Sequence, residues 1–153
     1  ETWVGKGSKL IKVRDQDSTD FDKCITAIKS KKIIALGFMG QRLDHFLAVC
    51  SSLVKHERLI FLVGERDIIF HLPNELSIKL PINSRVSLFP FKEIKMVEAV
   101  GLKYPVKDII FSPLGTIGTS NVSIRENIRI SYDGSGMLGI FSSRYMDIFY
   151  NSM

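Results

Sequence analysis

The sequence is poor in cysteine and has no long hydrophobic run, and each shortage excludes a class of protein. Its two cysteines, Cys24 and Cys50, fall on apolar positions of predicted helices. This placement predicts reduced core thiols in a cytoplasmic protein rather than a disulfide-stapled secreted domain. No apolar run approaches the roughly 18 residues that a membrane-spanning helix needs, so we expect no contact with a membrane.

Positive charge is in slight excess but is not clustered. The net charge is +5 over 153 residues, and apart from residues 29–32 the lysines and arginines are scattered. No stripe of basic and aromatic residues occurs, which argues against a nucleic-acid partner. Hydrophobic residues make up 45% of the chain, which is enough for the core of one domain or two small ones and excludes a disordered protein.

Several catalytic signatures are also missing. The glycine turn at residues 37–40 lacks both the G-K-[ST] ending of a Walker A loop and the glycine spacing of a Rossmann fingerprint. No G-x-S-x-G elbow occurs, which argues against a hydrolase triad. His56 and His71 stand at no ligand spacing from a cysteine or an acidic residue, which argues against a zinc site.

The first part of the chain predicts an α/β layer. Thr19 is a helix N-cap with Asp22 three residues later, in the position of a capping box. Apolar runs and helical periodicities then alternate. The pattern predicts strands over residues 9–14, 33–36 and 59–63, and helices over residues 21–28 and 46–53. The β-α-β-α-β order indicates a parallel sheet.

The pattern changes near residue 73. Beyond it, short strands are separated by turn residues, and residues 133–136 join the last two strands as a hairpin. We expect strands over residues 76–80, 85–89, 95–100, 108–111, 127–132 and 137–141. The predicted fold is therefore α/β plus all-β, with a partial parallel-sheet layer in residues 1–73 and an antiparallel β-sandwich in residues 74–153.

An acidic segment precedes the first predicted helix. Asp15, Asp17 and Asp20 fall within six residues, together with Gln16. Helix capping and the helix dipole explain one such residue but not the whole group. Hard oxygen ligands also suit Mg²⁺, which takes one or two carboxylates together with substrate phosphates. Turn formation and metal binding both remain open from spacing alone.

The segment of residues 37–45 follows a predicted strand and opens a helix. Its glycines let a phosphate approach the backbone, and the helix N-terminus favours an anion. Arg42 can form a fork with phosphate oxygens, and Asp44 can accept a hydrogen bond or bind a metal. His45 fits a helix start better than a general base. An ordinary strand–turn–helix connection is the alternative.

Two features of the second half could contact a ligand. The polar loop at residues 115–121 reads as a hairpin connection, but its hydroxyl and amide groups could also cap a polar ligand edge. Tyr104 precedes a proline and is therefore expected to be extended. It is either a core residue or an exposed ring that stacks on a flat heterocycle.

Read in order, these motifs resemble the thiamine pyrophosphokinase family. The resemblance covers residues 9–141 and rests on five segments in the family's order. They are D-Q-D-S-T-D-F at residues 15–21, G-F-M-G-Q-R-L-D-H at residues 37–45, S-L-F-P at residues 87–90, G-L-K-Y-P at residues 101–105 and T-S-N at residues 119–121.

The resemblance implies an enzyme that transfers a diphosphoryl group from ATP to the hydroxyl of thiamine and releases AMP, with Mg²⁺ as cofactor. Such chemistry consists mainly of positioning and charge neutralisation. The resemblance further implies a homodimer whose active site lies between the catalytic α/β domain of one subunit and the thiamine-binding β domain of the other.

The family's roles carry over to matching positions. The resemblance assigns Mg²⁺ to Asp20, ATP phosphates to Arg42, and thiamine to Asp44 and Gln16. We expect Gln16, Gly40 and His45 to join Arg42 around ATP, and count Asp20, Arg42 and Asp44 as catalytic. From the partner subunit, thiamine contacts would come from Tyr104, Ser120 and Asn121. The family often has Trp where this chain has Tyr104, which predicts altered thiamine affinity.

The chain departs from the family at its beginning. It starts at Glu1, and the family's upstream G-D-x-D-S segment with further catalytic carboxylates is absent. We therefore expect an N-terminally incomplete chain that lacks roughly 60–70 residues of an α/β layer. Such a chain should expose a sheet edge and turn over ATP poorly.

Two other functions stay open. One is a non-catalytic module that binds thiamine or thiamine phosphate without forming AMP. The other is a related pyrophosphokinase with another alcohol acceptor, for which Tyr104 in place of Trp is the only hint.

Overall fold

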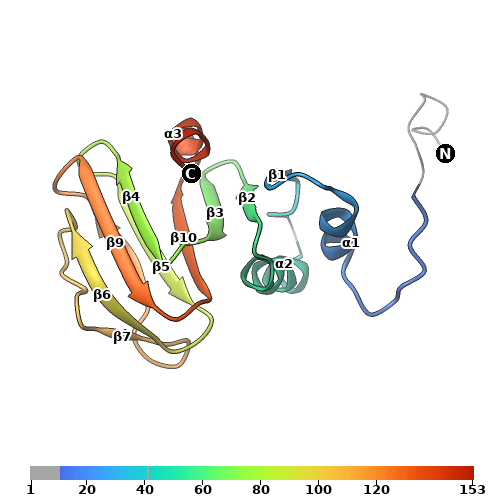
Figure 1. The fold of residues 1–153 in the computed structure, drawn as a ribbon, viewed down its shortest axis with the longest axis horizontal. Coiled ribbons are helices and arrows are strands. Elements are labelled where there is room, and N and C mark those ends of the chain that lie inside the picture. The colour runs from blue at the N-terminus through green and yellow to red at the C-terminus, as the bar shows by residue number, and fades with distance from the viewer. Residues whose placement is uncertain (1–10, 41) are drawn as a thin grey trace.

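Two β-sheets carry the fold, and helices pack on both faces of the larger one (Figure 1). This computed structural model describes residues 11–40 and 42–153. Sheet A has the order β1 (Lys32–Leu36), β2 (Leu59–Val63), β3 (Asp67–His71), β10 (Met137–Ser142), β5 (Arg85–Pro90), β8 (Gly118–Val122). Sheet B has the order β4 (Glu75–Lys79), β9 (Asn127–Asp133), β6 (Ile94–Val100), β7 (Ile110–Phe111).

The α/β part consists of a parallel strand pair and two helices. Strands β1 and β2 run parallel, and α2 (Leu43–Lys55) connects them. The short helix α1 (Asp20–Ala27) packs beside α2 through Phe21 and Ile25, which are buried in one cluster with Ile33 and Leu62 of the sheet. The apolar residues recur with the period of a helix, so each helix has one apolar face, and this face covers sheet A.

The second core lies between the two sheets. Inward residues of both sheets form one cluster that includes Phe70, Leu88, Met96 and Ile130. Helix α3 (Met146–Ser152), which follows the 3-10 turn η2 (Ser143–Tyr145), adds Phe149 against Phe70. The predicted α/β plus β-sandwich class is confirmed, with sheet A mixed because antiparallel strands join the parallel pair.

Three details differ from the sequence-based expectation. Residues 11–14 have no regular secondary structure, so the predicted strand is wrong for them, while residues 9 and 10 lie outside the described part. Strands β3 and β8 were not predicted. Because β3 pairs with both β2 and β10, sheet A contains strands from both sides of residue 73, and the division at that residue stays a prediction.

Neither cysteine forms a disulfide, but only one of them is a core residue. Cys50 is buried in α2, and its burial raises the thiol pKa to about 11. Cys24 is exposed on α1, so its predicted place in the core is wrong: the buried stripe of this short helix consists of Phe21 and Ile25 only. Within the described residues, no helix is both long and apolar enough to cross a membrane.

Candidate functional site

A cavity of about 710 Å³ opens where helices α1 and α2 begin. It brings together the two motifs that the sequence singled out, although about twenty residues separate them in the chain. Five of the predicted site residues line it: Asp20, Gly40, Arg42, Asp44 and His45. The remaining wall is formed by Ser18, Thr19, Phe21, Gly37, Phe38, Ala48 and Val49.

A capping box fixes the start of α1. The Asp22 amide donates to Thr19 Oγ1 at 3.1 Å, and the Thr19 amide donates back to Asp22 Oδ2 at 3.3 Å. Partial burial opposes ionisation of Asp22, but hydrogen bonds from Thr19, Ser52 and His56 hold its pKa below the ordinary value. Capping therefore uses Asp22, and the carboxylate of Asp20 is left for the cavity.

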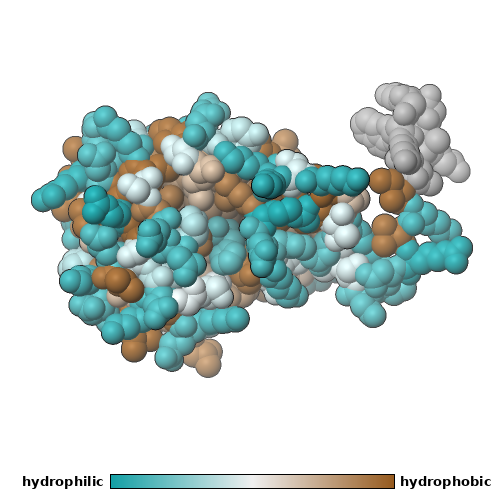
Figure 2. Space-filling view, viewed as in Figure 1, coloured by the Kyte–Doolittle hydropathy of each residue, from teal (hydrophilic) through white to brown (hydrophobic). Residues whose placement is uncertain are grey.

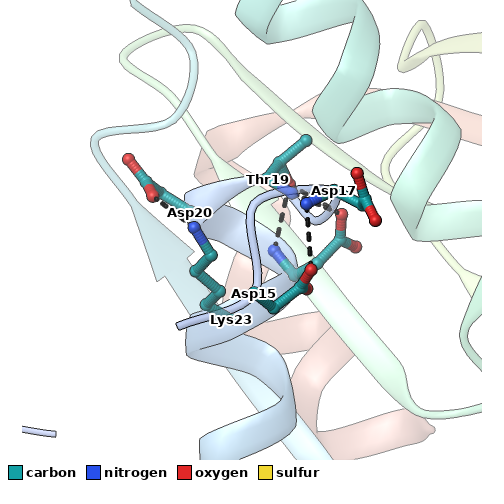
Figure 3. A network of polar contacts seen from close by, with 6 residues as sticks. Asp15, Asp17, Thr19, Asp20 and Lys23 are labelled. Carbon is teal, nitrogen blue, oxygen red and sulfur yellow. Dashed lines mark hydrogen bonds and ion pairs between the residues drawn. The ribbon is translucent and has the colours of Figure 1, made fainter. Parts of the chain in front are cut away.

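The carboxylate of Asp20 is open to solvent. Its side chain is 93% exposed and makes one ion pair, to Lys23 at 3.6 Å on the next turn of α1. Asp15 instead accepts the amide of Asp17 at 2.9 Å, and this bond, after a hydrogen bond from Ser18, helps to lower the pKa of Asp15. Figure 3 shows that Asp20 and the pair Asp15–Asp17 point to different sides of the helix start.

These carboxylates do not form a preassembled metal cage. Among the described residues, no group of three His, Cys, Asp or Glu side chains could hold a metal ion. Mg²⁺ does not require such a cage, since one or two carboxylates and substrate phosphates commonly hold it. Asp20, exposed in the cavity beside an anion-favouring helix start, is a donor that fits this mode of binding.

The α2 side of the cavity has a helix start without a side-chain cap, next to the ion pair of Arg42 and Asp44. The chain leaves β1 through Gly37 at φ +82°, and α2 begins after Arg42, whose side chain does not cap the helix. Arg42 therefore leaves the first amides of α2 uncapped, and an uncapped helix start favours an anion. Arg42 Nη2 lies 2.6 Å from Asp44 Oδ2, and Arg42 Nε donates to Oδ1 at 3.2 Å.

This two-point ion pair sets the charge of the cavity wall. The hydrogen bond from Arg42 lowers the pKa of Asp44 to about 2, and the same bond raises the pKa of Arg42. Both groups are therefore charged at neutral pH. The guanidinium has five donors, so it can bind phosphate oxygens while it remains beside Asp44.

One aromatic contact couples the two halves of the cavity. Phe21, next to Asp20, packs edge-to-face on Phe38 of the glycine turn, with ring centroids 4.9 Å apart. The sequence analysis did not single out Phe38, although it lies inside the 37–45 motif. Its signal is an aromatic residue between the two glycines of the turn.

The other predicted site residues lie outside this cavity. Gln16 is exposed in the coil before α1. Tyr104, Ser120 and Asn121 belong to the β half, where Tyr104 is 55% exposed and Asn121 is buried at 5%. One chain thus holds the phosphate-type residues and the aromatic residue in two separate places.

Two family models match the chain in succession. The model described as "Thiamin pyrophosphokinase, catalytic domain" matches residues 1–62, and the one described as "Thiamin pyrophosphokinase, vitamin B1 binding domain" matches residues 72–137. Among curated proteins, the chain is 24% identical over 133 residues to thiamin pyrophosphokinase 1 of Caenorhabditis elegans, covering 76% of this chain and 55% of that protein. It is 27% identical over 150 residues to thiamine pyrophosphokinase 1 of Oryza sativa, covering 87% and 57% respectively.

Solved structures show the same likeness. The thiamine pyrophosphokinase of Bacillus subtilis superposes with a TM-score of 0.70 at 27% identity, covering 84% of this chain and 64% of that one. The enzyme of Geobacillus thermodenitrificans gives a TM-score of 0.70 at 25% identity, covering 84% and 63%. The chain thus spans 55–57% of the length of the curated relatives that it matches.

Proposed function

The chain belongs to the thiamin pyrophosphokinase family, and we propose that it takes part in this family's reaction. The oxygen of the thiamine hydroxyl attacks the β-phosphorus of ATP, the bond between that phosphorus and the bridging oxygen of the α-phosphate breaks, and AMP leaves. The hydroxyl proton is released to solvent, and thiamine diphosphate is formed. The observation that carries the proposal is the cavity in which the Asp20 and Arg42–His45 segments meet at two helix starts.

The cavity residues divide the work by charge. Arg42 and the amides at the start of α2 neutralise the phosphates of ATP, and Gly40 lets them approach the backbone. Asp44 keeps Arg42 oriented through their two-point pair. His45 and Gln16 are assigned to the rim of the ATP site. Asp20 would hold Mg²⁺, and the ion would supply further charge neutralisation for the phosphates.

Thiamine is assigned to the β half of a second copy of the chain. Tyr104, the stacking residue in this proposal, is exposed but does not line the cavity of its own chain. A homodimer that joins the cavity of one subunit to Tyr104, Ser120 and Asn121 of the other completes the site. Figure 2 shows hydrophobic residues reaching the surface at the end of the molecule formed by β6 and β7, and exposed apolar area of this kind is available to an interface.

The test is thiamine-dependent AMP release by the complete product of the gene, with ATP and Mg²⁺. Asp20→Asn and Arg42→Met are each expected to lower kcat/KM about a hundredfold, because each removes a charge that faces the transferred group. Asp147→Asn is the matched control, since Asp147 lies exposed in the first turn of α3. Reduced thiols and a cytoplasmic location complete the proposal.

Three outcomes would redirect it. Thiamine binding without AMP would indicate a non-catalytic binding module and remove the roles of Asp20 and Arg42. AMP formation with another alcohol but not with thiamine would indicate a different acceptor. Activity that is unchanged in both variants would place the chemistry outside this cavity.

A further inference from the structure

Asn121 is a buried amide whose hydrogen bonds converge on the backbone of Tyr104. The amide of Tyr104 donates to Asn121 Oδ1 at 3.0 Å, and Asn121 Nδ2 donates to the Tyr104 carbonyl at 2.7 Å. The amide of Val122 donates to the same Oδ1 at 2.8 Å. The side chain of Asn121 therefore supplies both an acceptor for the Tyr104 amide and a donor for the Tyr104 carbonyl, as a neighbouring strand would.

A bulge in β8 places this amide. Val86 pairs with Asn121 and Leu88 pairs with Gly118, so one residue of β5 faces two residues of β8 between these pairs. Ser120 takes up the extra length with φ +59°. Its amide donates to Ser87 Oγ at 3.0 Å, and Ser87 is as deeply buried as Asn121. Bulges of this kind re-aim side chains.

The backbone around Tyr104 is held at further points. The Lys103 amide donates to the Val122 carbonyl at 2.8 Å, and Leu102 forms a bridge with Ser123. The ring of Tyr104 nevertheless stays 55% exposed, with Lys103 Nζ at 5.4 Å from its centre. A large ring that the protein does not bury, on a backbone that buried polar groups fix, has the form of a platform for a flat ligand.

We propose that Asn121 is a positioning residue, which holds the backbone of Tyr104 so that the ring is presented to the heterocycle of thiamine. This inference rests on the proposed function for the identity of the ligand. The family resemblance implies direct contact between Asn121 and thiamine. In this proposal Asn121 instead affects thiamine binding by holding Tyr104 in place. Ser87 supports the bulge beside Asn121 from the opposite strand, because its Oγ accepts the amide of Ser120.

A double-mutant cycle separates the two roles. Asn121→Ala and Tyr104→Ala are each expected to raise the KM for thiamine about tenfold, the size of one lost stacking contact, and to leave the KM for ATP unchanged. If Asn121 acts only through Tyr104, the double variant also shows about tenfold. A hundredfold rise in the double variant shows independent contact with thiamine and overturns the proposal, as does a normal KM in Asn121→Ala.

A second measurement does not depend on activity. Trp3 is the only tryptophan of the chain, so Trp3→Phe with Tyr104→Trp places a single fluorescent ring on the platform. Adding Asn121→Asp, which keeps the acceptor oxygen and removes the donor to Tyr104, should lower the anisotropy of this tryptophan, while Asn151→Ala on α3 should not. Equal anisotropy in the tryptophan parent and in its Asn121→Asp and Asn151→Ala variants overturns the positioning role.

The two readouts keep the hypotheses apart. If the parent protein neither binds thiamine nor forms AMP, the proposed function fails, and the anisotropy still reports whether Asn121 holds the ring. If AMP forms but substitution of Asn121 changes neither the anisotropy nor the KM for thiamine, the positioning inference alone fails.

Discussion

Arg58 holds the last turn of the helix that carries Asp20. Its guanidinium donates to the Ile25 carbonyl at 2.8 Å and to the Ile28 carbonyl at 2.5 Å. The Ile25 carbonyl lies in the last turn of α1 and also accepts the Ile28 amide at 3.2 Å, and the Ile28 carbonyl belongs to the C-cap. No further helical turn supplies amide donors there, and a positive charge also complements the helix dipole. An eight-residue helix of this kind is unstable in isolation, so we expect its position to depend on this contact.

The expected cost of losing the contact is moderate. Hydrogen bonds from a charged donor contribute about 1.5–3 kcal/mol each, but the Arg58 side chain is only partly buried, and water takes over part of what the carbonyls lose. We therefore expect Arg58→Met, which keeps the apolar stem, to destabilise α1 by about 2 kcal/mol. This corresponds to a roughly thirtyfold larger fraction of locally open helix.

Hydrogen exchange of the backbone amides measures this opening directly. Amides of α1 should exchange about thirtyfold faster in Arg58→Met, whereas amides of β4 and β9 in the sandwich should keep their rates. Arg125→Met, at an exposed position between β8 and β9, is the matched control and should change neither. Unchanged exchange in α1, or an equal acceleration in the sandwich, would show that Arg58 does not act on this helix and would refute the reasoning.

Three further predictions concern separate parts of the chain. Gly101→Ala should destabilise the protein by about 2 kcal/mol or more in urea unfolding, because φ is +85° there and an added Cβ would lie 2.6 Å from a backbone carbonyl of β9; a loss below about 0.5 kcal/mol would contradict it. A thiol reagent at pH 8 should label Cys24 quickly and Cys50 only on unfolding, because Cys24 is exposed and burial raises the pKa of Cys50 to about 11; two fast thiols by mass spectrometry would contradict this. An NMR titration should find that Asp44 ionises with a pKa of about 2, and Arg42→Gln should raise this pKa toward the ordinary value, because the lost hydrogen bond is the main cause of the shift. Since the pKa of Asp44 is lower in the folded state, any stabilisation by the pair is present above the ordinary pKa and is lost as the pH falls through about 2. An unchanged pKa of Asp44 in Arg42→Gln would contradict the pairing.

Local signals in the sequence predicted the elements whose causes are local. The capping box at Thr19 and Asp22 forms as the spacing predicts, because both partners lie within one helical turn. The turn at residues 133–136 does connect β9 to β10, but the predicted hairpin is wrong, because β9 lies in sheet B and β10 in sheet A and the two strands do not pair with each other. The alternation in β9 also matches its burial, with Ile128 and Ile130 inside.

The two missed strands have different causes. Strand β3 contains a clear apolar run, Ile68 to Phe70, and pairs with the strand just before it, β2, so its local signals were sufficient to predict it. Only its pairing with β10, about seventy residues away, leaves no signal in the local sequence. Strand β8 has glycine, threonine, serine and asparagine before its last residue, Val122, and three of these types are typical of turns. Its bulge and hydrogen bonds place it in the sheet despite that composition.

Residue types and positions predicted several residues that line the cavity, but not the contacts that hold those residues in place. Asp20 and Arg42 each stand where the sequence pattern predicts that a helix begins, so both could be selected as candidates before the fold was known, and both line the cavity. The contacts that position them could not, because Arg58 and Phe38 have ordinary local patterns and act through neighbours on other elements.

The two ligand-facing regions rest on supports of different strength. Asp20 lies on α1, and this helix is held by two buried side chains and by the hydrogen bonds of Arg58. Tyr104 is fastened by backbone and amide hydrogen bonds to a two-sheet core. Because local opening scales with the number of buried contacts that must break, we expect the α1 wall of the cavity to open before the backbone that carries Tyr104. We therefore expect any adjustment around the proposed phosphate ligand to occur in α1.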